Sequence, residues 1–382
     1  MSEATRTSSG GKAAALGVLL REGFPVPDGF VVPRGGQPAG ADAAHSLRDA
    51  VARELGRLGD PVVAVRSSAM DEDTTEASAA GQYESILGVH GAVDVCRAIA
   101  ACRESVRAAR AGSYWARIGD TSPHASEMAV LVQPVIEAEA SGVMFTPEQH
   151  GAPTRIEASW GLGLAVVSGT VSPDSYEVAS DGSIGCSVGS KQMRIDLDQE
   201  RGGAVTHAVA PDKQRARALD DVSVAALADL GDRVAGVLGD PQDVEWAVAD
   251  GVVWILQARA ITATPPATRA LDPTDEADAL NGTPGSHGKV TAAARIVRGP
   301  SDFAGVRRGD VVVCRCTDPA WTPLFTIAAG VVTETGGALS HAAIVAREFG
   351  IPAVLGLAGA TTRIEDGARI TVDGTSGSVT VL

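Results

Sequence analysis

The stretch Thr333–Val354, TETGGALSHAAIVAREFGIPAV, contains a single histidine, His341. The β-branched run at 327–333 predicts a strand that leads into this stretch. The Gly336-Gly337 pair then marks a turn, and Ser340 is a typical residue for a helix N-cap. The spacing therefore predicts a strand, a turn and a helix that begins at His341.

The end of this helix is also marked in the sequence. Residues 342–349 favour helix, Gly350 is a typical C-terminal signal, and Pro352 prevents continuation. A helix N-terminus has free N–H groups and a partial positive charge, so it suits a bound phosphate. An imidazole there could carry a phosphoryl group, but a lone histidine is more often a capping or core residue.

A resemblance favours the first of these two interpretations. Together with 316–325 (CTDPAWTPLF), the stretch resembles the phosphohistidine swivelling domain of the PEP-utilising enzymes, a group that includes pyruvate phosphate dikinase, PEP synthase and rifampin phosphotransferase. The resemblance continues to the chain end through Asp366-Gly367 and 372–375. It implies that His341 is the residue that becomes phosphorylated.

Composition limits the possible classes of protein. The 382 residues, 45% of them apolar, are enough for two or three folded domains. The net charge of −15 argues against non-specific nucleic-acid binding. No apolar run reaches the roughly 18 residues of a membrane span, and the N-terminal residues lack the apolar segment of a secretory signal. We therefore expect a cytoplasmic protein that binds neither membrane nor nucleic acid.

The first two thirds of the chain contain several apolar runs. Those at 62–68, 128–135 and 141–146, and a fourth that starts at 155, predict buried strands. Lys12 follows two glycines and opens a helical run, but the GxxxxGK spacing of a P-loop is absent. In isolation Lys12 would be interpreted as a solvated helix residue.

In this order the segments resemble the ATP-grasp domain of PEP synthase and rifampin phosphotransferase over residues 8–264. The resemblance implies an ATP site. Lys12 and Arg66 would bind phosphates, Gly81 and Ser85 would lie in the loop that covers the phosphates, and Gln133 and Val135 would form the adenine hinge. One departure is Leu164, because relatives commonly have Glu after the second Gly of the WGLG motif.

The segment 243–259, DVEWAVADGVVWILQAR, predicts a β-hairpin with two possible registers. A two-residue Asp250-Gly251 turn would put Glu245 and Gln257 on opposite faces. A three-residue loop, 249–251, would shift the register by one.

In the second register Trp246 faces Trp254 within an apolar band, which favours this arrangement. Glu245, Gln257 and Arg259 then share the other face. Without the family resemblance this would be the exposed polar face of an edge hairpin. With it, Glu245 and Gln257 are expected to bind Mg²⁺ and all three to contact the nucleotide.

These features predict an α/β (α+β) chain. Residues 1–262 form the ATP-grasp domain, 263–284 a flexible linker, and 285–382 the small β/β/α phosphohistidine domain. Residues 212–238 have the apolar spacing of one or two amphipathic helices. The linker of about 22 residues would have a mean span of about 25 Å as a flexible coil, which permits the last domain to swing.

The resemblance implies a dikinase-type phosphotransferase with ATP and Mg²⁺ as cofactors. His341 would accept the β-phosphate of ATP, release AMP and inorganic phosphate, and pass the group to a small hydroxyl or amine acceptor, as in antibiotic modification or natural-product biosynthesis. We recognise no acceptor domain in the sequence, so a carrier that donates to a partner protein is the alternative. A non-catalytic nucleotide sensor is a third possibility.

Overall fold

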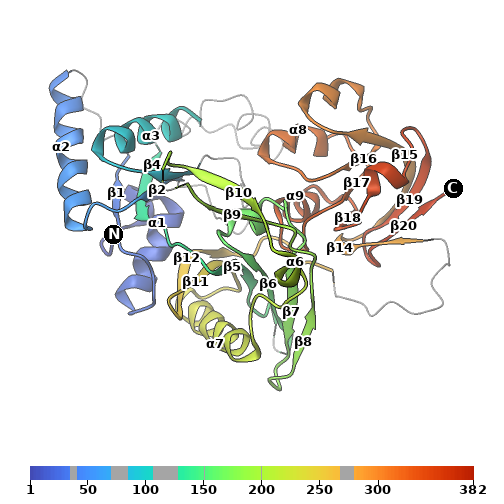
Figure 1. The fold of residues 1–382 in the computed structure, drawn as a ribbon, viewed down its shortest axis with the longest axis horizontal. Coiled ribbons are helices and arrows are strands. Elements are labelled where there is room, and N and C mark those ends of the chain that lie inside the picture. The colour runs from blue at the N-terminus through green and yellow to red at the C-terminus, as the bar shows by residue number, and fades with distance from the viewer. Residues whose placement is uncertain (35–40, 70–84, 106–127, 150, 199, 267–278) are drawn as a thin grey trace.

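The computed structural model describes residues 1–34, 41–69, 85–105, 128–149, 151–198, 200–266 and 279–382. Figure 1 shows an N-terminal lobe, coloured blue to yellow, and a C-terminal lobe, coloured orange to red. The two chain termini lie on opposite sides of the molecule (Figure 1). Within the described part of the chain, no helix is both long enough and apolar enough to cross a bilayer.

A four-stranded antiparallel sheet forms one part of the N-terminal lobe. Its order is β1 (Phe30–Val32), β4 (Ala129–Pro134), β2 (Val63–Ser68) and β3 (Ser85–Val89). Helix α3 (Ala92–Ser105) packs on β2, and α2 (Ala41–Arg57) packs against α3. The apolar runs predicted as strands at 62–68 and 128–135 are thus confirmed as β2 and β4.

A six-stranded antiparallel sheet forms the second part of this lobe. Its order is β12 (Val252–Ala260), β11 (Gln242–Ala249), β5 (Ala140–Phe145), β6 (Thr154–Trp160), β7 (Asp174–Val178) and β8 (Ile184–Ser187). Two of these strands, β5 and β6, confirm the apolar runs expected at 141–146 and from 155. A short pair, β9 (Met193–Leu197) and β10 (Ala204–Ala208), stands apart from this sheet.

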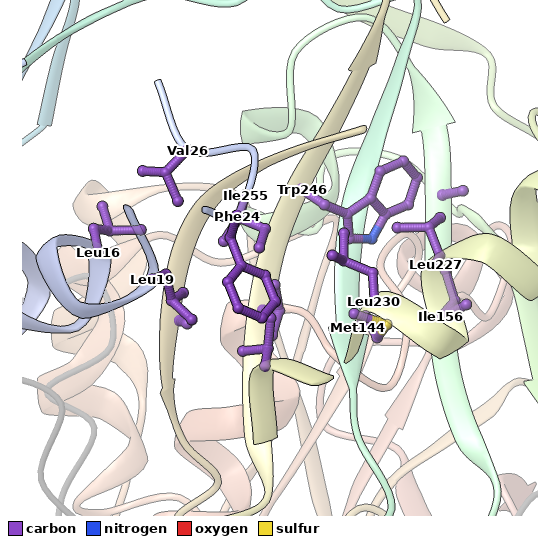
Figure 2. Packing of buried hydrophobic residues seen from close by; sticks show 14 of the residues in the cluster. Leu16, Leu19, Phe24, Val26, Met144, Ile156, Leu227, Leu230, Trp246 and Ile255 are labelled. Atoms are coloured by element: carbon purple, nitrogen blue, oxygen red, sulfur yellow. The ribbon is translucent and has the colours of Figure 1, made fainter. Parts of the chain in front are cut away.

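Two helices cover the core of the six-stranded sheet. They are α1 (Arg6–Arg21) and α7 (Asp221–Leu238). In Figure 2, Leu227 and Leu230 of α7 lie beside Trp246, whereas Leu16 and Leu19 of α1 lie toward Ile255. Helix α7 begins where Asp220 accepts a hydrogen bond from the backbone N–H of Ser223 at 2.8 Å, and it ends at the left-handed Gly239. The amphipathic segment 212–238 is therefore confirmed as α7, preceded by the short α6 (Pro211–Gln214).

The turn of the β11–β12 hairpin corrects the predicted register. Ala249 pairs with Val252, and both Asp250 (φ 52°) and Gly251 (φ 72°) are in the left-handed region. The three-residue loop was therefore wrong. An Asp-Gly pair tolerates two positive φ angles, and the resulting turn matches the strand twist.

A β-bulge restores the shared face that the wrong register had predicted. Trp246 pairs with Ile255 and not with Trp254, whereas the next pair is Glu245 with Gln257, so Leu256 is the extra residue. Because a bulge shifts the register by one, Glu245 and Gln257 end on the same face despite the two-residue turn.

The C-terminal lobe has an eight-stranded mixed sheet. Its order is β13 (Leu280–Asn281), β20 (Ser378–Val381), β19 (Arg369–Asp373), β15 (Lys289–Val297), β16 (Val311–Cys314), β17 (Gly330–Thr333), β18 (Ala353–Leu355) and β14 (Thr283–Ser286). Strands β15 to β18 are parallel to one another. Strands β13 and β14 begin within the segment predicted as a linker, while 267–278 of that segment lie outside the described residues.

Helices and apolar clusters cover this mixed sheet. The α-helices are α8 (Thr322–Phe325), α9 (His341–Phe349) and α10 (Ala360–Arg363), and the 3₁₀ helices are η2 (Pro300–Gly305) and η3 (Pro319–Trp321). Helix α9 lies at the boundary between the two lobes (Figure 1). The fold therefore puts the start of α9 next to the N-terminal lobe.

Candidate functional site

A cavity of about 190 Å³ lies between the two sheets of the N-terminal lobe. Its walls are mainly apolar, and the charged side chains of Arg66 and Glu245 form its polar side. The lining is Pro27, Ala64, Arg66, Ser85, Leu87, Gln133, Pro134, Val135, Ile136, Gly142, Leu162, Gly163, Leu164, Val167, Glu245, Trp246 and Leu256. An apolar pocket with a few convergent polar groups is the usual form of a nucleotide or small-molecule site.

The structure brings together many of the residues expected to bind ATP. Arg66, Ser85, Gln133, Val135 and Glu245 all line this cavity. Others are placed differently: Lys12 is buried in α1, outside that lining, and Gly81 lies outside the described residues.

A hydrogen-bonded cluster joins the two sheets at the polar side of the cavity. Nη2 of Arg66 donates to Oε2 of Glu245 and to Oε1 of Gln257, both at 2.9 Å. Nη1 of Arg66 donates to the carbonyl of Leu256, which is the residue at the bulge, at 2.7 Å. The bulge thus brings a carboxylate, an amide oxygen and a guanidinium to one point.

The predicted hinge lies at the end of β4. The side-chain amide of Gln133 donates to the carbonyl of Pro27 at 2.8 Å, which holds that side chain against the preceding loop. The backbone N–H of Val135 donates to the carbonyl of Val62 at 3.0 Å. In this conformation the N–H of Val135 is used within the protein, whereas its carbonyl has no donor among the residues that the structure describes.

Arg259 forms a buried ion pair on the same hairpin. Its Nε and Nη2 lie 2.8 and 2.7 Å from Oδ2 of Asp243. Burial raises the pKa of Asp243, although the charge of Arg259 acts in the opposite direction. Asp243 was not singled out from the sequence. Its position two residues before Glu245 on a strand could have identified it, since such residues share a face.

The start of α9 agrees with the sequence prediction. Ser340 occupies the N-cap position, the helix begins at His341, and Gly350 ends it in the left-handed conformation (φ 65°). The Ser340 side chain does not cap the helix, however. Its hydroxyl donates to the carbonyl of Gly337 at 2.8 Å and so stabilises the preceding turn instead.

The imidazole of His341 is buried, with 4% of the residue exposed. Its Nδ1 lies 3.2 Å from the hydroxyl oxygen of Thr317, while Nε2 has no hydrogen-bond partner among the described residues. Burial lowers the pKa of His341 to about 4. Asp318 opposes this shift and the positive charge of Arg259 adds to it. The ring is therefore neutral at neutral pH and lies within the electrostatic reach of Arg259.

The loop before His341 contacts the N-terminal lobe directly. The hydroxyl of Thr335 donates to the carbonyl of Gly169 at 2.6 Å, and the N–H of Gly336 donates to the carbonyl of Val171 at 3.1 Å. Leu339 packs in an apolar cluster with Leu162, which also lines the cavity. His341 therefore lies next to the lobe that contains the cavity.

Glu157 of β6 is a further contact that sequence reasoning missed. It is 3% exposed, and its Oε2 accepts a hydrogen bond from the N–H of Leu339 at 3.2 Å. A glutamate inside the apolar run IEASW could have signalled a specific role, because a buried carboxylate needs partners.

Comparisons with known proteins agree with this arrangement. The model of the pyruvate phosphate dikinase AMP/ATP-binding domain matches residues 39–279, and that of the PEP-utilising enzyme mobile domain matches 306–377. These two matches define a class of ATP-binding enzyme with a mobile domain. The chain belongs to this family, the PEP-utilising enzymes with a pyruvate phosphate dikinase-type nucleotide-binding domain. Its fold is mixed α/β, with the AMP/ATP-binding domain before the mobile domain.

Several relatives carry the name phosphoenolpyruvate synthase. A probable enzyme of this name from Methanothermobacter thermautotrophicus is 35% identical over 97% of this chain and 61% of its own length. The one from Aeropyrum pernix is 32% identical over 97% and 56%, and that from Pyrococcus furiosus 37% identical over 89% and 44%. The chain thus spans at most about three fifths of the length of these relatives.

Two solved structures show partial similarity. Enzyme I, solved in solution, has 35% identity and a TM-score of 0.20 over 21% of this chain and 33% of its own. D-alanine–D-alanine ligase from Bacillus anthracis has 11% identity and a TM-score of 0.31 over 65% of this chain and 56% of its own.

Proposed function

We propose that the chain is an ATP-dependent phosphotransferase of the dikinase type, in which His341 carries the phosphoryl group. The observation that carries this proposal is the position of His341. A buried, neutral imidazole lies at the start of a helix, within the electrostatic reach of Arg259 and beside the lobe that contains the cavity. The family match of 39–279 to an AMP/ATP-binding domain supports ATP as the ligand of the cavity.

The nucleotide would use both sides of the cavity. The adenine would lie between the apolar walls near Gln133 and Val135, with the Val135 carbonyl as a polar contact. Its phosphates would extend toward Arg66 and Arg259, because a guanidinium matches the geometry of phosphate oxygens. Lys12, Gly81 and Ser85 complete the set of residues that we assign to nucleotide binding.

Glu245 and Gln257 fit a divalent cation. Their oxygens both accept from the same nitrogen of Arg66 at 2.9 Å, so the two acceptors converge on one positively charged group. No group of three or more His, Cys, Asp or Glu among the described residues could hold a metal by itself. Mg²⁺ commonly takes one or two protein ligands with the rest supplied by phosphates and water. Bound there, Mg²⁺ would neutralise charge on the phosphates during transfer.

The two ring nitrogens of His341 have different roles in this proposal. Nδ1 would remain bound to Thr317, and the lone pair of Nε2 would attack the β-phosphorus of ATP. The new bond joins Nε2 to phosphorus, and the bond from phosphorus to the α–β bridging oxygen breaks, so AMP leaves. At this point Nε2 carries both the β- and the γ-phosphoryl groups. Water then breaks the bond between them, which releases the γ-phosphate as inorganic phosphate and leaves the β-phosphoryl group on Nε2. Arg259 would offset the charge that develops on the phosphoryl oxygens.

A second transfer would pass the group from His341 to an acceptor. We infer that 1–262 form the nucleotide-binding domain and 285–382 the phosphohistidine domain, with the predicted linker 263–284 between them. Its last residues already belong to β13 and β14 of the C-terminal sheet, so we assign the connection that allows the second domain to swing to the part before β13. The acceptor that we propose is a small hydroxyl or amine compound, as in antibiotic modification or natural-product biosynthesis. A partner protein that supplies the acceptor site is the alternative.

The test is incubation of the purified chain with Mg-ATP, followed by intact mass measurement and AMP quantification. We expect one acid-labile phosphate on the wild type and none on His341→Ala. An adduct that persists in His341→Ala would refute the assignment. Phosphohistidine that accumulates until a second protein is added would favour the carrier alternative over a small-molecule acceptor.

A further inference from the structure

The carboxylate of Glu157 crosses from the N-terminal lobe into the loop that precedes His341. Oε2 accepts the backbone N–H of Leu339 at 3.2 Å, and the amide of Ala338 lowers the pKa of the same carboxyl. Glu157 is in β6, whereas Ala338 and Leu339 belong to the C-terminal lobe. One side chain of the N-terminal lobe thus binds a backbone amide of the other lobe.

Gly337 leaves the space that this carboxylate occupies. A Cβ atom added at Gly337 would lie 2.2 Å from Oε1 of Glu157 and 2.4 Å from its Cδ. Since atoms cannot approach that closely, only glycine fits at 337 while the carboxylate is in place. The loop is therefore shaped around this glutamate.

The position of this contact connects it to His341. Leu339 is two residues before His341, and Ser340 between them is the N-cap of α9. Backbone contacts of Thr335 with Gly169 and of Gly336 with Val171 hold the other end of the same loop. Fixing Leu339 therefore fixes the first turn of α9 and with it the imidazole.

The charge of Glu157 is incompletely compensated. Burial raises the pKa of Glu157 to about 7, while the amides of Leu339 and Ala338 and the guanidinium of Arg347 lower it. Arg347 is on α9 itself, and two of its nitrogens, Nε and Nη2, have no hydrogen-bond partner among the described residues. The burial of this carboxylate requires contact between the two lobes, because water would solvate it again if they separated.

We propose that Glu157 is the positioning residue that seats the His341 loop on the nucleotide-binding lobe during phosphorylation by ATP. This inference rests on the proposed function, since it assigns a role in the first transfer step. Glu157 touches neither the nucleotide cavity nor the imidazole. It acts through the loop, so its loss should slow the phosphorylation of His341 without weakening ATP binding.

The first experiment measures the single-turnover rate of His341 phosphorylation with saturating Mg-ATP. Glu157→Gln keeps the volume but replaces the charged acceptor of the Leu339 N–H with a neutral amide, so we expect phosphorylation to be about tenfold slower or more, since hydrogen bonds to a charged group contribute at least about that factor. The dissociation constant for a non-hydrolysable ATP analogue should stay within about twofold of the wild type. The matched control is Glu139→Gln, an exposed glutamate of the same lobe that contacts the N–H of Asp250. It should phosphorylate at the wild-type rate.

A complementary pair of substitutions separates positioning from a general loss of folding. Gly337→Ala alone should be slow, because its methyl group meets the carboxylate. Adding Glu157→Ala removes the group that the methyl meets, so the two losses should not add, and the double variant should be no slower than Glu157→Ala alone. A wild-type rate in Glu157→Gln, a matching loss of ATP affinity, or additive losses in the double variant would each overturn the proposal.

A measurement without ATP distinguishes this proposal from the proposed function. Amide hydrogen exchange in the peptide that covers 335–345 should be faster in Glu157→Gln than in the wild type, because the amide of Leu339 loses its charged acceptor. If the wild type never takes phosphate from ATP, the proposed function fails while this exchange test still applies. Equal exchange in the two proteins would overturn the seating role even if His341 is phosphorylated.

Discussion

The hydroxyl oxygen of Thr317 lies 3.2 Å from Nδ1 of His341, and among the described residues Nε2 of the same ring has no partner. Thr317 follows β16, whereas His341 opens α9. The contact therefore fixes the rotation of the imidazole from a separate element of the same lobe. It also gives the two nitrogens different environments, which a free imidazole would not have.

The first prediction concerns this contact. Thr317→Val keeps the shape of the side chain but removes the hydroxyl, so Nδ1 loses its partner and the ring is less well oriented. We expect His341 phosphorylation to slow by about tenfold, corresponding to about 1.4 kcal/mol, with ATP affinity unchanged. Thr317→Ser retains the hydroxyl and should stay close to the wild-type rate. Equal rates in the valine and serine variants would show that the hydrogen bond does not matter.

Local signals in the sequence were sufficient for many elements. The apolar runs correctly predicted β2, β4, β5 and β6, and Gly350 correctly predicted the end of α9. The β11–β12 hairpin shows a feature that such local signals do not predict. A choice between two turn lengths could not include the bulge at Leu256, because the bulge is held by the contact of its carbonyl with Arg66 of another sheet. Periodicity within one segment does not contain that information.

Contacts between the lobes were beyond the reach of sequence reasoning for the same reason. The segment around Glu157 was expected as a strand, and Gly337 was expected as a turn residue. That the carboxylate would occupy the space left by that glycine depends on how two separate sheets meet. The burial of His341 and the influence of Arg259 on its pKa are likewise properties of the assembled chain.

The second prediction concerns pH. Burial lowers the pKa of His341 to about 4 in the folded chain, while an unfolded chain has the ordinary value of about 6.5. Between these values the unfolded state binds the extra proton. This contribution to stability is therefore complete above about pH 6.5 and is lost as the pH falls toward 4, up to about 3 kcal/mol.

The measurement is the free energy of unfolding at several pH values for the wild type and His341→Gln. The difference between the two proteins should become less favourable to the wild type on acidification. The comparison is needed because the raised pKa of Glu157 has the opposite effect, and this effect is common to both proteins. A difference that does not vary between pH 7.5 and 5 would contradict the burial of a neutral His341.

The third prediction concerns the polar cluster of the cavity. Arg66→Ala removes the guanidinium that joins Glu245 and Gln257, and we expect ATP to bind more weakly by about 2 kcal/mol, since charge-assisted hydrogen bonds contribute on this order. Glu245→Gln should instead raise the Mg²⁺ concentration needed for half-maximal phosphorylation, because it removes the one carboxylate of the pair. Titrations of nucleotide and of Mg²⁺ separate the two effects. An unchanged Mg²⁺ requirement in Glu245→Gln would remove Glu245 from the metal site.

The fourth prediction concerns the stability of the N-terminal lobe, away from the cavity. Asp174 and Lys191 are both fully buried and form an ion pair between Nζ and Oδ1. Oδ1 also accepts the N–H of Gly189 at 2.8 Å, and Oδ2 accepts the N–H of Ala218 at 2.7 Å. The carboxylate therefore organises several loops, and the lysine balances its charge.

Lys191→Met keeps most of the side-chain volume but leaves Asp174 buried without a cation. We expect a loss of about 3–5 kcal/mol in the free energy of unfolding, measured by denaturant titration. The matched control is Arg194→Met, which breaks the partly exposed pair of Arg194 with Asp196 at 3.0 Å and should cost less than about 1 kcal/mol. If the two variants lose similar stability, the buried pair does not hold the loops together.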